Sequence, residues 1–193
     1  MGCPSLSCAR NIFCREGSAV KLMYLLRHTK SSWDDPSIED FDRPLNKRGR
    51  KAATLLAEHF RRNDIRPEIT LCSPANRTRQ TLDSLLPALD HREAIFDRRL
   101  YEASRHTLQA LLSELPSRCH SVLLIGHNPG LQRLALYLVR AAPGTPALRA
   151  LNDKLPTGGL VTLSAAIDDW TDLPAGTCTL ESFVRPTDLG GED

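Results

Sequence analysis

The sequence lacks the strong charge, the long apolar runs and the paired cysteines that mark several classes of protein. Its 193 residues carry 25 Lys and Arg against 23 Asp and Glu. The resulting net charge of +2 is too small to indicate binding to nucleic acid or to an anionic membrane. No apolar run approaches the roughly 18 residues of a membrane span, and polar residues interrupt every candidate signal-peptide core in residues 1–19. We therefore expect a cytoplasmic protein.

Metal-binding and disulfide patterns are also missing from the sequence. The six cysteines are either scattered singly, as buried apolar residues usually are, or lie near the N-terminus without a CxxC spacing (Cys72, Cys119 and Cys178; Cys3, Cys8 and Cys14). The six histidines form no HExxH or comparable motif. We expect neither a metal ion nor another cofactor, and nothing in the sequence requires more than a monomer.

The length fits one domain with a tail at each end. Residues 1–19 hold half of the cysteines and no periodic pattern, so we interpret them as a disordered tail. Val20 could also correspond to a GTG start codon, and the native gene product would then have an intact mass that lacks the first 19 residues. Residues 20–184 form the predicted domain, and residues 185–193 a polar C-terminal tail.

The first predicted strand ends in a fixed charge and a titratable group. Lys21 to Leu26 form an apolar run that predicts a buried strand, and Arg27 and His28 follow it directly. Ligands bind at the carboxyl ends of strands in open α/β sheets. A positive charge beside a nucleophilic imidazole suits attack on an anionic substrate. The alternative is that His28 only caps the strand or packs against it.

His127 occupies a similar position after a second apolar strand, which is predicted at residues 121–125. Asn128 is the expected N-cap of the next helix, with Pro129 at its first position. The free N–H groups at a helix start favour an anion. Alternatively, His127 is a loop histidine that hydrogen-bonds to the backbone.

Arg77 is a third candidate for an anion site. Ser73-Pro74 is expected to open a helix, with Pro74 at its first position and Arg77 and Arg79 in its first turns. A cation near the positive end of a helix dipole is unfavourable unless an anion joins it. A bound phosphate would explain Arg77, and the alternative is a solvated arginine.

The whole chain alternates strands with helices. Further helices are predicted at residues 46–63 and 105–115, strands at residues 68–72, 94–97, 160–166 and 177–184, a polar loop at residues 29–43, and a proline-rich loop or flap at residues 143–156. This order predicts a three-layer α/β/α domain with a largely parallel central sheet.

Several short motifs in this order resemble the histidine phosphatase superfamily (branch 1), also called phosphoglycerate mutase-like. The matching pieces are Leu26-Arg27-His28, Ser73-Pro74-Ala75 with Arg77-Thr78-Arg79-Gln80-Thr81, and Gly126-His127-Asn128. Pieces that resemble the small SixA-type phosphohistidine phosphatases are Asp42-Arg43-Pro44-Leu45-Asn46 with Gly49, Leu100-Tyr101-Glu102-Ala103, and Leu155-Pro156-Thr157-Gly158-Gly159. The resemblance covers the chain from about Val20 to Val184 and implies a phosphoglycerate mutase-like fold.

The resemblance implies that His28 is a nucleophile phosphorylated on nitrogen. It also implies that Arg27, Arg77 and His127 bind the phosphate. The chain departs from the family at Thr29, where a Gly or Ala is usual and a larger side chain crowds or polarises the nucleophile loop. It is also too short for the inserted general acid of larger members, so Glu102 is the nearest candidate for that role.

These residues suit phosphoryl transfer without a metal ion. Only the neutral imidazole attacks, and the two arginines should lower the pKa of His28. A phosphohistidine leaves as imidazole and needs a general acid less than an ester does. We therefore expect a phosphatase that acts on phosphohistidine in a signalling or phosphotransfer protein. The alternatives are a small-molecule phosphomonoesterase with Glu102 as acid, and a non-catalytic phosphate-binding module.

Overall fold

The computed structural model describes residues 20–90, 94–140 and 144–191, so the predicted N-terminal tail lies outside the described residues. In this part of the chain six strands form one sheet in the order β3-β2-β4-β1-β5-β6. The strands are β1 (Val20–Arg27), β2 (Ile69–Cys72), β3 (Ala94–Phe96), β4 (Ser121–Gly126), β5 (Leu160–Ala166) and β6 (Thr179–Val184). The first four pair in parallel, and β5 and β6 add antiparallel. The predicted largely parallel sheet is confirmed.

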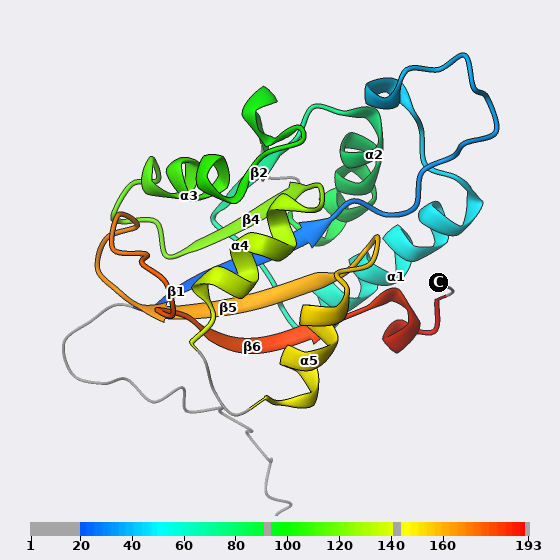
Figure 1. Cartoon of the computed structure of the whole chain (residues 1–193). Coiled ribbons are helices and arrows are strands. Elements are labelled where there is room, and N and C mark those ends of the chain that lie inside the picture. The colour runs from blue at the N-terminus through cyan, green and yellow to red at the C-terminus, as the bar shows by residue number, and fades with distance from the viewer. Residues whose placement is uncertain (1–19, 91–93, 141–143, 192–193) are drawn as a thin grey trace, which may run out of the picture.

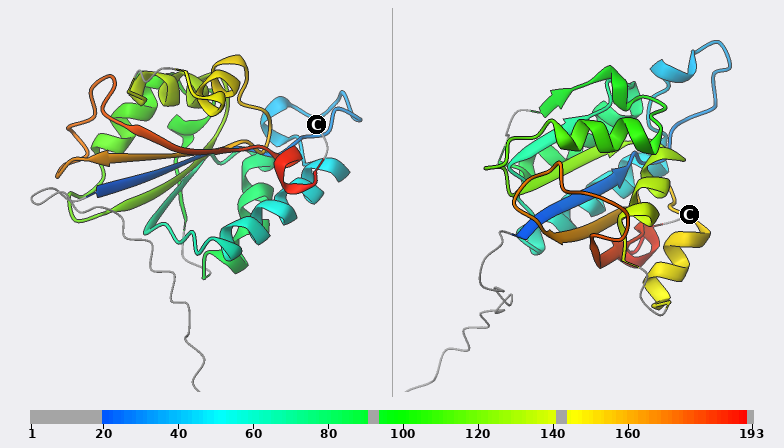
Figure 2. Two further views of the ribbon diagram at one scale, coloured as in Figure 1. Left: turned by 90° about the horizontal axis from the view of Figure 1, so that it is seen from below. Right: turned by 60° about the vertical axis from the view of Figure 1, so that its left-hand side comes forward.

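Helices cover both faces of this sheet (Figures 1 and 2). One face packs against α1 (Lys47–Arg62) and α2 (Asn76–Leu85), and the other packs against α3 (Arg105–Ser113), α4 (Gly130–Leu138) and α5 (Pro146–Asp153). Alternate residues of β1 enter the two cores, Tyr24 and Leu26 on one side and Met23 and Leu25 on the other. A strand buried on both faces has no polar positions to alternate with, which explains its continuous apolar run. The predicted three-layer fold is confirmed.

The first helix is fixed to the end of β1 by local contacts that the sequence encodes. The Asn46 side chain caps α1 by accepting from the Gly49 N–H at 2.8 Å, as predicted. Gly49 also packs directly on the Lys30 backbone, because a Cβ at this position would lie 2.0 Å from the Lys30 carbonyl oxygen. A glycine is therefore needed to bring α1 against the loop that follows His28.

Two predicted helix starts are wrong. Helix α2 begins at Asn76, beyond Pro74, because the Thr78 hydroxyl bonds the Ser73 carbonyl at 2.7 Å and holds an extended turn before the helix. Helix α4 begins at Gly130 and not at Pro129. The expected cap, Asn128, is recruited elsewhere: its amide donates to the Leu155 carbonyl at 3.0 Å.

The proline-rich loop predicted at residues 143–156 is also wrong for its described part. Residues 146–153 form α5, which Thr145 caps by accepting from the Leu148 N–H. Pro146 occupies the first turn, where a missing N–H has no cost, and Leu151 is fully buried against the sheet. Burial of this one face stabilises the helix, and its single proline stands where it does not disturb the helix.

The stretch after β6, expected as a polar tail, forms a 3₁₀ helix over Pro186–Leu189. Pro186 is buried, and the short helix lies beside α1 (Figure 2). None of the helices in the described ranges combines the length and the apolar character that a membrane span requires.

Candidate active site

The ends of β1 and β4 place the two candidate histidines side by side. The strands are parallel neighbours with Arg27 opposite Gly126, so the residue that follows each strand lies at the same edge of the sheet. The His28 N–H donates to the Gly126 carbonyl at 3.1 Å, and the ring centroids of His28 and His127 are 5.1 Å apart. Only 7% of His28 and 6% of His127 is exposed.

A cavity of about 310 Å³ opens over these two rings. All five predicted site residues line it: Arg27, His28, Arg77, Glu102 and His127. Arg77 reaches it from the first turn of α2, and Glu102 reaches it from the turn before α3. We call this space the catalytic cavity. The structure brings the five side chains together, while their individual roles stay predictions.

The hydrogen bond at His28 defines which ring nitrogen is free. Its Nδ1 lies 2.7 Å from the Thr29 carbonyl oxygen, which can only accept, so Nδ1 carries the proton. The Nε2 atom therefore keeps its lone pair. This is the tautomer that a nucleophile attacking through Nε2 requires.

Burial keeps the His28 imidazole neutral. Desolvation, followed by smaller effects of His127, Arg77 and Arg27, lowers the pKa of His28 from 6.5 to about 3, against an opposing effect of the bond to Thr29. The predicted direction is confirmed, but burial and not the arginines is the largest cause. The imidazole is thus ready to attack at neutral pH.

Thr29, the residue that departs from the family pattern, faces away from the catalytic cavity. It is fully buried, and both its N–H and its hydroxyl meet the Thr81 hydroxyl of α2, at 3.1 and 3.2 Å. Its methyl group lies against Gly158, where an added Cβ would come within 3.3 Å. The larger side chain is therefore accommodated between α2 and the turn before β5.

Asp40 holds Arg77 in place, and we did not predict it. Arg77 donates to the backbone carbonyl of Asp40 and to its Oδ2 at 2.8 Å. Tyr101 donates to the same Oδ2 at 2.8 Å, and Arg43 donates to Oδ1 at 2.7 Å. Burial alone would raise the pKa of Asp40, but the bond from Tyr101 and the nearby Arg77 outweigh it and lower the pKa. An ionised carboxylate therefore fixes the guanidinium.

The signal for this arrangement in the amino-acid sequence is weak. Asp40 belongs to an acidic run that we described as a polar loop, while Arg43 and Tyr101 stand in the motifs that resemble the SixA type. The position of Asp40 close to these motifs was the one indication that it belongs to the site.

His127 is held between Ser73 and Arg77. Its Nε2 lies 2.8 Å from the Ser73 hydroxyl, and its Nδ1 lies 3.3 Å from Arg77 Nη2, which can only donate. Nδ1 is therefore an acceptor here, and Nε2 donates to Ser73. Burial, followed by Arg77, lowers the pKa of His127 to about 3. The Ser73 hydroxyl can also donate, so His127 can exchange tautomers and offer an N–H to an anion.

Arg27 has a guanidinium that is held by a backbone carbonyl and includes a buried donor atom without a partner. Its Nη1 donates to the Leu155 carbonyl at 2.9 Å. Its Nε is one of two buried side-chain atoms in the described ranges that lack a hydrogen-bond partner. An unpaired buried donor costs about 1–3 kcal/mol, and an anion that accepted from it would relieve this cost.

Glu102 lies exposed at the rim of the catalytic cavity, in a left-handed backbone conformation with φ of 50°. This conformation is uncommon for a residue with a side chain. The next residue packs tightly on α4, because a Cβ at Gly130 would lie 2.0 Å from the Ala103 carbonyl oxygen. Within the described ranges the carboxylate has no hydrogen bond or ion pair, so it is free to meet a substrate.

The chemistry of the catalytic cavity is that of an anion site. Among the described residues, no group of three His, Cys, Asp or Glu side chains could hold a metal ion. Two oriented guanidinium groups flank a neutral imidazole, which matches a tetrahedral anion that presents one face to a nucleophile.

Comparisons with known sequences agree with this geometry. The family model described as histidine phosphatase superfamily (branch 1) matches residues 23–122. An uncharacterized protein of Mycobacterium tuberculosis is 34% identical over 163 residues, which cover 83% of this chain and 99% of the relative. An uncharacterized chloroplastic protein of Arabidopsis thaliana is 30% identical over 184 residues, or 88% of this chain and 79% of the relative.

Solved structures show the same likeness. The structure named as phosphohistidine phosphatase SixA of Agrobacterium tumefaciens is 30% identical with a TM-score of 0.73, over 86% of this chain and 98% of its own. A structure with the same name from Nakamurella multipartitia is 26% identical with a TM-score of 0.75, over 88% of this chain and 98% of its own. A phosphoglycerate mutase from Bacillus anthracis, 13% identical with a TM-score of 0.62 over 90% and 96%, shares the fold.

Proposed function

This chain belongs to branch 1 of the histidine phosphatase superfamily and is a phosphatase of the SixA type, and we propose that it hydrolyses protein-bound phosphohistidine through a phosphorylated His28. One observation carries the proposal: a buried, neutral imidazole with a free Nε2 lies in a cavity that Arg27 and Arg77 also line.

The reaction would proceed in two steps, and the same residues would bind the oxygens of the phosphoryl group in both. Nε2 of His28 attacks phosphorus while the bond from phosphorus to the substrate nitrogen breaks. The substrate ring, protonated on its other nitrogen by solvent, takes the electron pair of that bond and leaves as neutral imidazole. Arg27, Arg77 and His127 stabilise the charge on the three equatorial oxygens. Water then attacks the phosphorylated His28, releasing inorganic phosphate and restoring the neutral ring.

The accessible cavity and the leaving group support phosphohistidine as the substrate. The residues that line the catalytic cavity come from the end of β1, from loops and from the first turn of α2, and they include the exposed Trp33 and Glu102, so we expect a side chain on another protein to reach it. An imidazole also leaves more readily than an alkoxide, which relaxes the need for a general acid. We propose a phosphorylated protein in a signalling or phosphotransfer system as the partner.

A small phosphate ester is the second candidate substrate, and the position of Glu102 favours it. The carboxyl group lines the catalytic cavity, has no partner among the described residues and could protonate an alkoxide leaving group. This alternative uses the same nucleophile and the same phosphate-binding residues.

The test is turnover of a phosphohistidine peptide in EDTA by the wild type and by His28→Ala. We expect metal-independent turnover that the substitution reduces by at least about 10³-fold, and a phosphorylated wild-type protein on rapid quenching. Turnover retained by His28→Ala would refute the mechanism. If the wild type hydrolyses neither the peptide nor phosphate esters, while phosphate still protects the fold against heat, the protein is a phosphate-binding module.

A further inference from the structure

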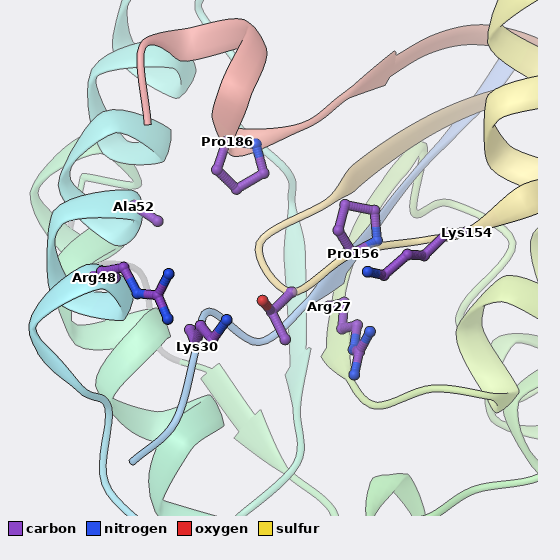
Figure 3. Close-up of a pocket in the computed structure, with 8 residues that line it drawn as sticks. Arg27, Lys30, Arg48, Ala52, Lys154, Pro156 and Pro186 are labelled. Carbon is purple, nitrogen blue, oxygen red and sulfur yellow. The ribbon is translucent and has the colours of Figure 1, made fainter. Parts of the chain in front are cut away.

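A second cavity of about 200 Å³ lies beside the catalytic cavity. Figure 3 shows the residues that line it. Its charged lining residues are Arg27, Lys30, Arg48 and Lys154, and we call it the basic cavity. The two cavities share Arg27, Lys30 and Thr157, so one wall separates them.

The side chains of the basic cavity come from well-anchored segments. Lys30 and Arg48 lie on one side and Lys154 on the other (Figure 3). Lys30 is fixed by the close packing of Gly49, and its carbonyl accepts from the Asn46 N–H at 3.0 Å. On the opposite side the Gly158 N–H donates to the carbonyls of Arg27 and His28, both at 3.0 Å. The backbone on this side of the basic cavity is therefore hydrogen-bonded directly to the backbone of His28.

The described residues that line this cavity are basic or uncharged. None of them is acidic, whereas Asp40 and Glu102 line the catalytic cavity. The ammonium groups of Lys30 and Lys154 have no hydrogen bond or ion pair among the described residues. Like charges that face one small space repel each other. This repulsion is relieved if an anion enters.

Arg27 supplies an independent indication of a missing ligand. It lines both cavities, and its buried Nε has no hydrogen-bond partner. Arginine binds phosphates and carboxylates through several donors at once. A substrate with anionic groups in both cavities would engage it from two sides.

We propose that the basic cavity binds a second anionic group of the same substrate whose phosphoryl group enters the catalytic cavity. The inference rests on the proposed function only in placing the phosphoryl group at His28. The second group is a phosphate or carboxylate. Its source is either an acidic side chain next to a phosphohistidine or a second anionic group of a small molecule.

The first experiment measures binding without turnover. Calorimetry compares the affinity of a series of alkane bisphosphonates of increasing length with that of ethylphosphonate. The proteins are the wild type, the double variant Arg48→Gln/Lys154→Gln, and the control Lys47→Gln, whose exposed side chain is next to Arg48 in α1. We expect the best bisphosphonate to bind the wild type about tenfold more tightly than the monophosphonate. The double variant should lose this preference and the control should keep it. Equal affinity at every length, or an equal loss in the control, would overturn the proposal.

The second experiment identifies the source of the anion. Two phosphohistidine peptides differ only in an Asp or Asn beside the phosphorylated residue. We expect the wild type to have a KM about fivefold lower for the acidic peptide, and Lys154→Gln to raise that KM alone, with kcat unchanged.

The outcomes separate this proposal from the proposed function. A bisphosphonate preference without a peptide preference supports a small molecule with two anionic groups. If neither peptide is hydrolysed, phosphohistidine hydrolysis is refuted while the calorimetry still decides the basic cavity. If the calorimetry shows no preference for a bisphosphonate, the basic cavity is refuted as a subsite, whatever the peptides show.

Discussion

The two neighbouring cavities share a wall but are built in opposite ways. In the catalytic cavity the Arg77 guanidinium is fixed by the Asp40 carboxylate, which also binds Tyr101 and Arg43. Both histidines there are buried and hydrogen-bonded, His28 to the Thr29 carbonyl and His127 to the Ser73 hydroxyl. In the basic cavity Lys154 is exposed on a flexible stem and has no ion pair among the described residues.

The catalytic cavity therefore depends on the orientation of its donors, whereas the basic cavity depends on its positive charge. Transition-state stabilisation depends on donors held in one orientation before the reaction begins. Binding a remote anionic group needs only positive charge nearby, which lysine supplies at longer range and which salt screens. Substitutions that keep the charge but change the geometry should therefore damage the catalytic cavity and spare the basic one.

The largest expected effect comes from Arg77→Lys, which keeps the charge and removes the planar fork. A lysine cannot bind Asp40 and the phosphoryl oxygens together, so we expect kcat/KM to fall by about 10³-fold. The matched control is Arg79→Lys, an exposed residue of the same helix that stacks on Phe96. Steady-state kinetics on both variants measures the difference, and equal losses would contradict the proposed role of Arg77.

A smaller and substrate-dependent effect is expected from Glu102→Gln. Hydrolysis of a phosphate ester should fall by about 10²-fold if Glu102 protonates the alkoxide, whereas phosphohistidine hydrolysis should barely change. The measurement is kcat on both substrates with the same preparation. An unchanged rate on the ester would remove Glu102 from the mechanism.

The buried histidines should make stability depend on pH. Their pKa values of about 3 lie below the ordinary 6.5, so the unfolded chain binds more protons between these values. The free energy of unfolding is therefore fully retained above pH 6.5 and falls as the pH decreases toward 3. At about pH 5 each histidine should contribute a loss of about 2 kcal/mol.

Urea unfolding at about pH 7 and pH 5 measures this loss, with His28→Asn expected to reduce it by about 2 kcal/mol. The exposed His106 supplies the control, and His106→Gln should leave the pH dependence unchanged. Nitrogen NMR of the free protein gives a direct check, since the His28 ring should show no titration near pH 6.5 and a protonated Nδ1. A midpoint near 6 would contradict a buried neutral nucleophile.

The smallest expected effect concerns salt. If Lys154 acts through charge alone, the KM of the acidic phosphohistidine peptide should rise about two- to threefold when the ionic strength increases from about 0.01 to 0.1 M. The Asn-containing peptide should change less, and Lys154→Gln should make the two peptides alike. The same salt dependence for both peptides in the wild type would argue that the lysine contributes nothing specific.

Local pattern was sufficient for most elements of the fold and failed at particular residues. The apolar run of β1, the Asn46 cap and the leucine spacing of the helices depend on residues within a few positions of one another, so the sequence shows them directly. Proline signals were less reliable. Pro74 and Pro129 stand before helices and not in them, while Pro146 begins a helix that we had expected to be a loop. Before α4 and in α5 contacts with distant segments outweigh the local preference, through the bond from Asn128 to Leu155 and the burial of Leu151. At Pro74 the bond from Thr78 to Ser73 acts over only five residues.

Residue order alone shows that Arg27 stands at the end of a buried strand and that His28 and His127 follow buried strands, and therefore that all three lie at the carboxyl edge of a sheet. The pairing of β1 with β4, which brings the two rings to 5.1 Å, depends on the folded chain as a whole. The contacts of Asp40 with Arg77, 37 residues away, and with Tyr101, 61 residues away, depend on it as well. Strand order and long-range ion pairs depend on burial and charge summed over the whole chain, which no local spacing records.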